Sequence, residues 1–325
     1  MAFRLRLAPE KTNFNFFRWQ MATFGGSMGL MVLAFAVWGI MGLNFGIDFQ
    51  GGTSIRTESS SAVDVGAYRA ALTALNVGDV AVSQVSDPNF RADQHVASIR
   101  ISAQDGEESV SPETMDLVTA ALMSVDPSLI ITSTDSVGPK VSAELIQSSI
   151  IAVAVASLFI LAFLWLRFEW QFALGGVLAL LHDVFITVGI FALFQIKFDL
   201  SIIAALLTIL GYSINDTVVV FDRLRENLQK YKTKPLRDVM NLSVNETLSR
   251  TLMTSLTTLI AVGAMMVFGG DVIRGFTFAI FIGIILGTYS SVYVAKNIVL
   301  MIGLDRSDKP KPKKGADHEF ANIDA

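Results

Sequence analysis

The sequence predicts an α-helical polytopic membrane protein with six transmembrane helices and one α+β ferredoxin-like domain between the first two. Of the 325 residues, 52% are hydrophobic and only 17% are charged, which is more apolar than a soluble core requires. Six apolar stretches are long enough to cross a hydrocarbon layer about 30 Å thick, which takes about 20 helical residues. One polar stretch, residues 44–140, separates the first two apolar ones.

The six apolar stretches define the expected spans. They cover residues 20–43, 141–166, 171–194, 201–221, 251–268 and 275–300. Basic residues precede the first stretch, and it lacks a small-residue cleavage pattern. We therefore expect residues 20–43 to be an uncleaved signal anchor that stays in the mature chain. The other five spans form a membrane body that runs from residue 141 to residue 302.

The positions of the basic residues predict the orientation. With the N-terminal arm (residues 1–19) in the cytoplasm, the turn at Arg167, the segment 222–250 and the C-terminal end also lie inside, and 18 of the 25 Lys and Arg residues are cytoplasmic. Such an excess is typical of cytoplasmic loops. We expect both termini inside and residues 44–140 on the opposite side of the membrane.

The C-terminal tail, residues 303–325, differs in composition from the rest. After Leu304 it has a basic run, Lys309–Lys314, followed by acidic residues and no apolar face. Such a segment cannot bury enough surface to fold, so we expect disorder. The basic run would add about 1 kcal/mol per charge if it touched anionic lipid, but a solvated tail is the favoured interpretation.

The polar stretch 44–140 has the element order of a split β-α-β unit. Strand, helix, strand, strand, helix and strand are expected at residues 53–57, 63–75, 80–85, 96–101, 111–123 and 130–133. Asp87-Pro88-Asn89 gives a turn signal, and Ser111-Pro112 gives a helix start. This order is that of a ferredoxin-like domain, a fold that does not by itself reveal a partner.

The most informative feature is a carboxylate inside an apolar span. Asp216 and its neighbour Asn215 interrupt the stretch that begins near Ser201. An ionised Asp at the centre of a membrane helix costs roughly 2.5–3.5 kcal/mol on insertion scales, so it persists where it faces protein, water or a partner. We therefore interpret Asp216 as a functional residue.

Arg250 is the candidate partner of this carboxylate. It stands at the start of the fifth span, one turn after Glu246, a position that suits a positive-inside anchor and an intramembrane partner of Asp216 equally well. If Arg250 reached Asp216, its charge would favour the ionised carboxylate while desolvation would oppose it. A small rearrangement would then change the proton affinity of the site.

Other polar or small residues interrupt the spans. His182 and Asp183, in the third span, could relay protons or bond a neighbouring helix, and the structural role is favoured. Gly283 and Gly287 form a GxxxG pattern, which predicts close helix approach. The pair Asp222-Arg223 ends the fourth span, where interfacial anchoring fits at least as well as chemistry.

Four motifs together resemble the SecF family of protein-export subunits. They are FGIDFQGG at residues 45–52, LLHDV at 180–184, GYSINDTVVVFDRLREN at 211–227 and LSRTLMTS at 248–255. The resemblance covers almost the whole chain, with one soluble domain in the expected place. The SecD family shares related motifs but has a much larger periplasmic insertion, so SecF is the better match.

The resemblance implies site residues, partners and location. In the family, the Asp of GYSIND, here Asp216, is the proposed proton-carrying carboxylate, and the Arg of LSRT, here Arg250, is its proposed electrostatic partner. The family is similar to one half of an RND-type transporter whose other half is SecD. It implies a bacterial inner membrane location with residues 44–140 in the periplasm.

The resemblance also implies an activity. SecD and SecF together use the proton motive force to promote preprotein translocation and release after ATP-driven export through the SecYEG channel. YajC and the SecA motor are further implied partners.

Other classes fit less well. An intramembrane aspartyl protease would have Asp residues on two adjacent spans, as Asp183 and Asp216 are, but the GxGD pattern is absent. A proton-independent scaffold for SecD and the channel explains the soluble domain, but it explains Asp216 only as a polar contact that holds neighbouring helices together. Small-molecule efflux proteins of similar helical architecture have far larger periplasmic domains than the one expected here. No nucleotide loop, metal cluster or nucleophilic triad is visible, so we expect no enzyme activity, cofactor or nucleic-acid partner.

Overall fold

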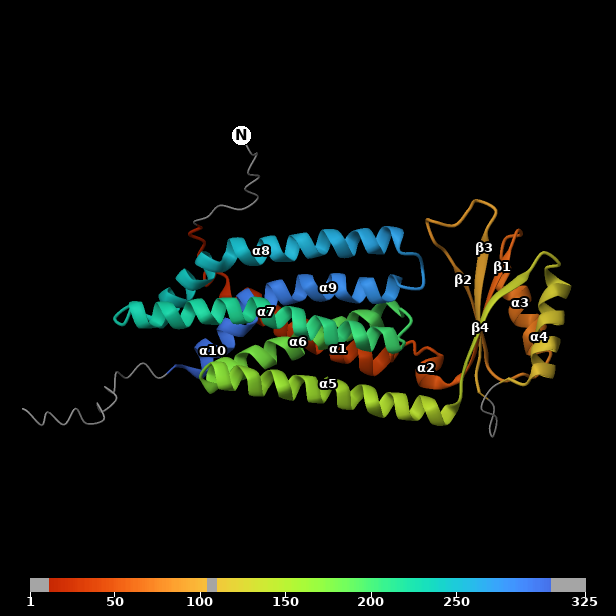
Figure 1. Cartoon of the computed structure of the whole chain (residues 1–325), viewed down its shortest axis with the longest axis horizontal. Coiled ribbons are helices and arrows are strands. Elements are labelled where there is room, and N and C mark those ends of the chain that lie inside the picture. Colours follow the sequence, from red (N-terminus) through yellow and green to blue (C-terminus); the bar gives the residue numbers. More distant parts are fainter. Residues whose placement is uncertain (1–11, 104–109, 305–325) are drawn as a thin grey trace, which may run out of the picture.

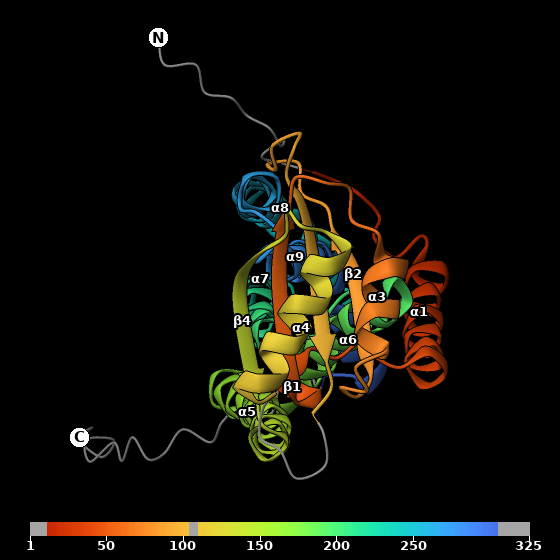
Figure 2. The ribbon, with the colours of Figure 1, turned by 90° about the vertical axis from the view of Figure 1, so that its right-hand side faces the viewer.

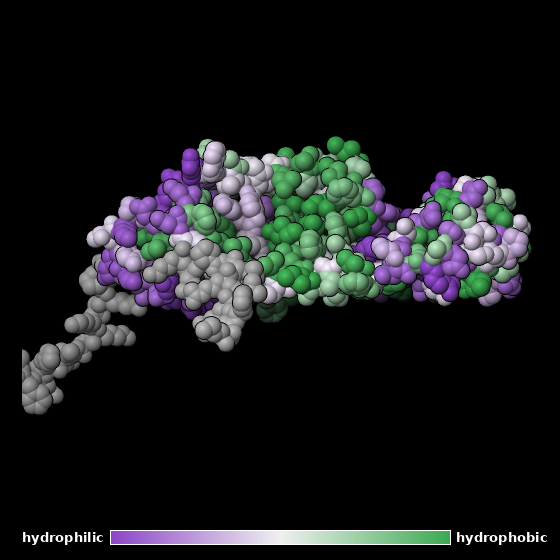
Figure 3. Space-filling view, turned by 90° about the horizontal axis from the view of Figure 1, so that it is seen from above, coloured by the Kyte–Doolittle hydropathy of each residue, from purple (hydrophilic) through white to green (hydrophobic). Residues whose placement is uncertain are grey.

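The computed structural model describes residues 12–103 and 110–304, and within them six helices are long and apolar enough to cross a membrane, as predicted. They are α1 (Gln20–Met41), α5 (Pro139–Arg167), α6 (Trp170–Phe194), α7 (Leu200–Lys230), α8 (Leu236–Phe268) and the continuous run of α9 (Arg274–Ser290), the π-helix η1 (Ser291–Ala295) and α10 (Lys296–Ile302). The helices form one elongated bundle (Figure 1). On the face shown in Figure 3, apolar side chains form a band across the middle of the molecule, with hydrophilic surface at the end opposite the sheet domain.

The segment 222–250, expected as a connection between spans, is mostly helical. Helix α7 continues to Lys230, and α8 already begins at Leu236. The two extensions leave the apolar band and are joined by a short turn over residues 231–235. The predicted tail lies almost entirely outside the described residues, as does most of the N-terminal arm.

The polar stretch folds as a small α+β unit with the predicted order of elements. After the short helix α2 (Ile47–Gln50) come β1 (Gly52–Ser59), α3 (Val65–Thr73), β2 (Val80–Val85), β3 (His95–Ile101), α4 (Pro112–Val125) and β4 (Ile130–Val137). The antiparallel sheet has the order β2-β3-β1-β4. Helix α4 starts as predicted, because Ser111 Oγ accepts a hydrogen bond from the Thr114 N–H and Pro112 occupies the first turn.

The two faces of this sheet differ. Helices α3 and α4 cover the face that points away from the bundle (Figures 1 and 2), over a core that includes Ile55, Ile99 and Leu122. The other face points toward the helix ends and carries a polar row in cross-strand register, formed by Ser83, Ser98, Arg56 and Ser133. A cavity of about 1,020 Å³ lies between this row and the bundle.

Two ion pairs join the sheet domain to the loop between α8 and α9 and to the first residue of α9. The guanidinium of Arg56 binds both carboxylate oxygens of Asp271, at 2.6 and 2.8 Å. Arg274 pairs with Asp87 at 2.8 Å. Bidentate Arg–carboxylate contacts fix orientation as well as distance. These pairs therefore hold the domain in a defined position above the helix ends.

The glycines of the FGIDFQGG motif are explained by backbone geometry. Gly51 and Gly52 both have positive φ, +73° and +112°, where side chains are strained. A Cβ on Gly52 would also lie 2.2 Å from the carbonyl oxygen of Ile101 on β3. Only glycine allows the chain to turn here from α2 into β1.

The GxxxG pattern mediates close helix approach, as predicted. Gly283 and Gly287 of α9 face α7, where a Cβ on Gly283 would lie 2.4 Å from side-chain carbons of Ile209. A Cβ on Gly287 would lie 2.8 Å from Ser213 Oγ. The missing side chains let α7 and α9 pack nearly backbone to backbone.

We expect Gly283→Ala to destabilise the bundle, because the added methyl group overlaps Ile209. Overpacking of this kind typically costs about 1–3 kcal/mol. The measurement is the midpoint of thermal unfolding of the purified protein in detergent. Gly211→Ala on α7 is the control, since nothing lies within 4 Å of its Cβ; equal midpoints for the two variants would contradict the packing account.

The Arg56–Asp271 pair predicts a pH-dependent domain contact. Burial disfavours the Asp271 carboxylate, but the hydrogen bonds and charge of Arg56 outweigh it and lower the pKa of Asp271. The contact is therefore present above the ordinary pKa of an aspartate, about 3.9, and is lost as the pH falls through the lowered value.

We expect Asp271→Asn to weaken the contact at neutral pH by about 1 kcal/mol. Hydrogen exchange at the loop between α8 and α9 should become faster. Arg91→Gln is the control, because the Arg91–Glu58 pair is exposed and lies within the sheet domain. Unchanged exchange in Asp271→Asn would mean that other contacts hold the domain.

Candidate functional site

Helix α7 places Asp216 on its buried face, where the side chain is 2% exposed. The carboxylate accepts two hydrogen bonds from hydroxyls of α8, Ser255 Oγ at 3.3 Å and Thr254 Oγ1 at 3.5 Å. Both distances exceed the 2.7–2.8 Å usual for hydroxyl donors, so the bonds are weak. A carboxylate with weak partners in an apolar bundle can change its contacts at small cost.

The contacts of Ser255 extend the site to a third helix. Its hydroxyl lies 2.7 Å from that of Thr288 on α9, and both groups can donate or accept. Asp216 is thereby linked to α8 and α9 through neutral hydroxyl groups.

Arg250 lies on α8 without direct contact to Asp216. Its side chain is exposed on the bundle, and among the described residues no hydrogen bond or ion pair joins the two. Thr254 lies between them, since its hydroxyl is 3.1 Å from the Arg250 carbonyl and 3.5 Å from Asp216. The structure places the pair on neighbouring helices, and their electrostatic pairing stays a prediction.

Asn215 is separated from this cluster although it is adjacent in sequence. It is exposed, whereas Asp216 is buried. Consecutive residues of an α-helix point about 100° apart. Asn215 therefore faces the outside of this chain.

His182 and Asp183 form a second polar cluster, inside α6. Asp183 is fully buried and His182 is 2% exposed. The Asp183 carboxylate contacts His182 Nδ1 at 3.0 Å, and accepts hydrogen bonds from Ser213 Oγ of α7 at 2.8 Å and Ser290 Oγ of α9 at 2.7 Å. The other ring nitrogen, His182 Nε2, has no partner among the described residues. This cluster bonds neighbouring helices, the favoured role from the sequence.

The two clusters meet on α7. Ser213 precedes Asp216 by three residues, so both side chains lie on one face of the helix. Ser213 donates a hydrogen bond to Asp183, while Asp216 accepts one from Ser255. The polar groups of α6, α7, α8 and α9 thus form one neighbourhood in the middle of the bundle.

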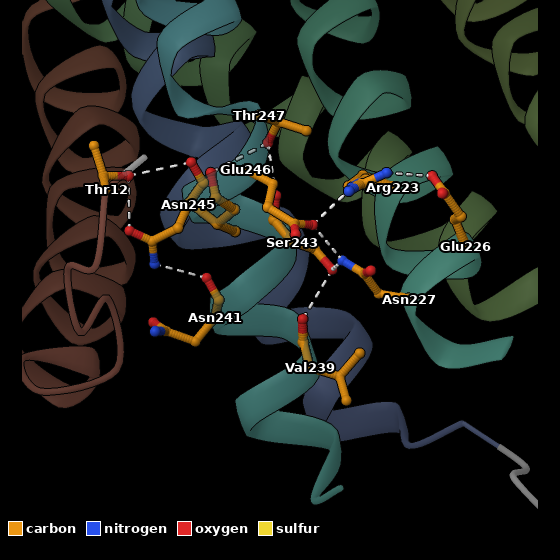
Figure 4. Close-up of polar contacts among 11 residues, drawn as sticks. Thr12, Arg223, Glu226, Asn227, Val239, Asn241, Ser243, Asn245, Glu246 and Thr247 are labelled. Atoms are coloured by element: carbon orange, nitrogen blue, oxygen red, sulfur yellow. Dashed lines mark hydrogen bonds and ion pairs between the residues drawn. The ribbon is translucent and has the colours of Figure 1, made fainter. Parts of the chain in front are cut away.

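A charged network joins the extensions of α7 and α8 (Figure 4). Arg223 contacts Glu246 at 2.7 Å and Glu226 at 2.5 Å, and Asn227 contacts Glu246 at 2.7 Å and Ser243 at 3.0 Å. Asp222 instead pairs with Arg167 at 2.6 Å. Asp222 and Arg223 therefore bind different partners: Asp222 connects α7 with α5, and Arg223 connects α7 with α8.

Several residues of the site carry little signal in the sequence. The hydroxyl residues that contact the two carboxylates are Ser213, Ser290, Ser255, Thr254 and Thr288. Ser and Thr are common in membrane helices, and only their helical spacing from Asp183 and Asp216 sets them apart. Lys296 falls within the sixth expected span; it is 1% exposed, and its Nζ has no hydrogen-bond partner in the described part of the chain.

Comparison with known proteins identifies the family. The model of "Protein export membrane protein SecD/SecF, C-terminal" matches residues 117–305, and that of "SecD/SecF GG Motif" matches residues 36–63. The protein translocase subunit SecF of Cereibacter sphaeroides is 65% identical over 325 residues, 100% of both chains. The chain belongs to the SecF family. The SecF subunit of Rhodobacter capsulatus is 61% identical over 99% of this chain and 98% of its own.

Solved structures agree with this assignment. The crystal structure of SecDF from Thermus thermophilus, a translocon-associated membrane protein, has a TM-score of 0.81 and 34% identity. The match covers 91% of this chain and 39% of that one. A second SecDF crystal structure, in a super-membrane-facing form, has a TM-score of 0.66 and 36% identity, over 90% of this chain and 39% of that one. This SecF-family protein is therefore a multi-pass membrane protein with a transport role.

The hydroxyl donors of Asp183 predict a stability effect. We expect Ser213→Ala and Ser290→Ala each to lower stability by about 1 kcal/mol, the typical worth of one hydrogen bond, and more if the carboxylate is left unsatisfied. The readout is thermal unfolding in detergent. Thr208→Ala on α7 is the control, because that hydroxyl is exposed and bonds only its own helix. Loss of equal size in the control would show that the donors to Asp183 have no special role.

Proposed function

We propose that this chain is the SecF half of a SecDF-type complex that uses the proton motive force to promote preprotein translocation and release. ATP-driven export through SecYEG would come first, with the SecA motor and YajC as further partners. Relatives named as protein translocase subunits support a transport role, and we assign no covalent chemistry to the chain.

The observation that carries the proposal is the buried Asp216 with its weak hydroxyl partners. A strongly paired carboxylate would keep one charge state, whereas bonds of 3.3 and 3.5 Å leave the group free to gain a proton and shift. Neutral hydroxyls can serve both states, since they donate to a carboxylate and accept from a carboxylic acid. The site can therefore alternate between the two.

Arg250 completes the proposed coupling. Its exposed position on α8 is costly in lipid, so this face is suited to cover by a partner subunit or to contact with water. We assign SecD as that partner. Protonation of Asp216 would weaken its attraction to Arg250 and let α7 and α8 shift relative to each other.

The available energy is adequate. Each elementary charge that crosses the membrane supplies roughly 2.3 kcal/mol per 100 mV. This changes a conformational equilibrium by one to two orders of magnitude. The ion pairs of Arg56 and Arg274 connect the sheet domain to the α8–α9 loop and the start of α9. A shift of α8 would therefore move the sheet domain.

We assign the chain to the bacterial inner membrane with both termini in the cytoplasm. In this topology residues 44–140 form a periplasmic ferredoxin-like domain, and the polar extensions of α7 and α8 are cytoplasmic. The excess of Lys and Arg at that end supports the assignment.

We expect Asp216→Asn to abolish the gradient-dependent stage of export while leaving assembly intact. The assay follows a preprotein intermediate in membrane vesicles after ATP is exhausted, with the proton gradient imposed or collapsed. Arg250→Met should have the same effect. Asp222→Asn is the control, because this carboxylate lies on the same helix but is exposed and pairs with Arg167.

A scaffold that needs no protons makes the opposite prediction. All variants would then complete translocation like the wild type, with or without the gradient. That outcome would reduce Asp216 to a structural contact between α7 and α8.

A further inference from the structure

A groove of about 530 Å³ runs along α8 and α9 beside Asp216. Ser255 and Thr288 lie midway along it, and Ser255 is the residue that donates to the Asp216 carboxylate. At one end, cytoplasmic in the topology proposed above, lie Phe16 and Tyr293. The groove connects the neighbourhood of the carboxylate with this end of the bundle.

A buried hydroxyl without a partner lies between Ser255 and the cytoplasmic end. Thr251 lines the groove and is 1% exposed, and its Oγ1 has no hydrogen-bond partner among the described residues. It precedes Ser255 by four residues on α8, a rise of about 6 Å. A short chain of water molecules with hydrogen bonds of about 2.8 Å can connect the two hydroxyls over that distance. Because buried hydroxyls are ordinarily paired, Thr251 marks a position suited to water.

The cytoplasmic end of the groove is sealed by aromatic and aliphatic side chains. Phe16 is 9% exposed and packs with Val244 and Val292. Its ring meets that of Tyr293 edge to face, with centroids 5.9 Å apart. Tyr293 belongs to the π-helix η1, a type of irregularity frequent at functional sites. Phe16 therefore lies between Thr251 and this end of the bundle.

Phe16 is carried by a segment that is bound to α8 through its backbone. Three side chains four residues apart on α8 hold this segment: Arg237, Asn241 and Asn245. Asn245 accepts from the Phe14 N–H at 2.8 Å, and Asn241 accepts from the Phe16 N–H at 2.9 Å. Thr12 also donates to Asn245, at 2.8 Å (Figure 4).

The segment is attached to α8 through side chains of that helix. These hydrogen bonds can be broken while the backbone hydrogen bonds of α8 stay in place.

Lys296 holds the same segment from the other side. Its Nζ lies 4.0 Å from the ring centroid of Phe17, 5.2 Å from that of Phe16 and 5.4 Å from that of Tyr293. An ammonium group over aromatic faces is attracted to them, more strongly when desolvated. Lys296 thus holds Phe16 and Phe17 in place through cation–π contacts.

We propose that this groove is the route by which the proton bound at Asp216 leaves toward the cytoplasm, with Ser255 and Thr251 as relay hydroxyls and Phe16 as the closure. The inference rests on the proposed function, because it requires Asp216 to carry a proton. It adds the relay groups and the barrier of the release step.

The proton balance of the step is simple. Protonated Asp216 gives its proton to Ser255 Oγ, and Ser255 passes its own hydroxyl proton to the water beside Thr251. Asp216 becomes a carboxylate and Ser255 keeps one proton. The water passes a proton to Thr251 Oγ1, whose own hydroxyl proton moves on toward the cytoplasmic end of the groove. Movement of Phe16 then admits further water, which takes the proton to the cytoplasmic side.

The test measures proton flux through the complex of this chain with its SecD partner, reconstituted in liposomes that contain a pH-sensitive dye. We expect Thr251→Val to lower the flux roughly tenfold, the equivalent of one lost hydrogen bond. Phe16→Ala should raise it, because the closure is removed. Thr257→Val and Phe14→Ala are the controls: the Thr257 hydroxyl is exposed and bonds only its own helix, and Phe14 is 57% exposed in the same segment.

Asp216→Asn separates this inference from the proposed function. If Asp216→Asn abolishes the flux while Thr251→Val and Phe16→Ala match their controls, the proton leaves by another route. The proposed route along the groove is then wrong, although the proposed function stands. Normal flux in Asp216→Asn would overturn both.

A second measurement does not depend on transport. The chain has no cysteine, so Thr251→Cys introduces a single thiol into the groove. A small water-soluble thiol reagent should label it slowly in the otherwise wild-type complex and faster when Phe16→Ala is added. Equal labelling rates in the two backgrounds would show that Phe16 does not control access of water to the groove.

Discussion

Carboxylates buried among apolar helices need partners from neighbouring helices, and the close contact of α7 with α9 supplies them. Gly283 and Gly287 remove the side chains that would otherwise separate the two backbones. At this distance Ser213 and Ser290 both reach Asp183, so one fully buried carboxylate ties α6, α7 and α9 together. The packing that holds the bundle together thus also sets the polar neighbourhood in which Asp216 lies.

The two carboxylates differ in how firmly they are held. Asp183 has donors at 2.7 and 2.8 Å besides His182, whereas the hydroxyls that face Asp216 lie at 3.3 and 3.5 Å. A firmly bonded group suits a fixed structural contact, and a weakly bonded group suits a change of state. The contrast supports a division of roles in which Asp183 organises the bundle and Asp216 carries the proton.

Much of this architecture can be predicted from the sequence. Apolar runs of the right length identified all six helices, and alternation with turn signals identified the sheet domain, because both patterns reflect local burial. The hydroxyl contacts of Asp216 and the buried Lys296 could not be predicted, since they depend on which helix faces meet. The distance between Arg250 and Asp216 could not be predicted for the same reason. The helical structure of residues 222–250 was also missed, because this polar segment lacks the continuous apolar stretch by which the spans were recognised.

The central claim is that Asp216 changes its protonation state when a gradient is applied, and infrared difference spectroscopy of the reconstituted complex tests it most directly. With isotope-labelled aspartate, the account predicts a carboxylic-acid carbonyl band that appears and disappears with the gradient and is absent in Asp216→Asn. A spectrum without such a band, or a band that persists in Asp216→Asn, would contradict the account.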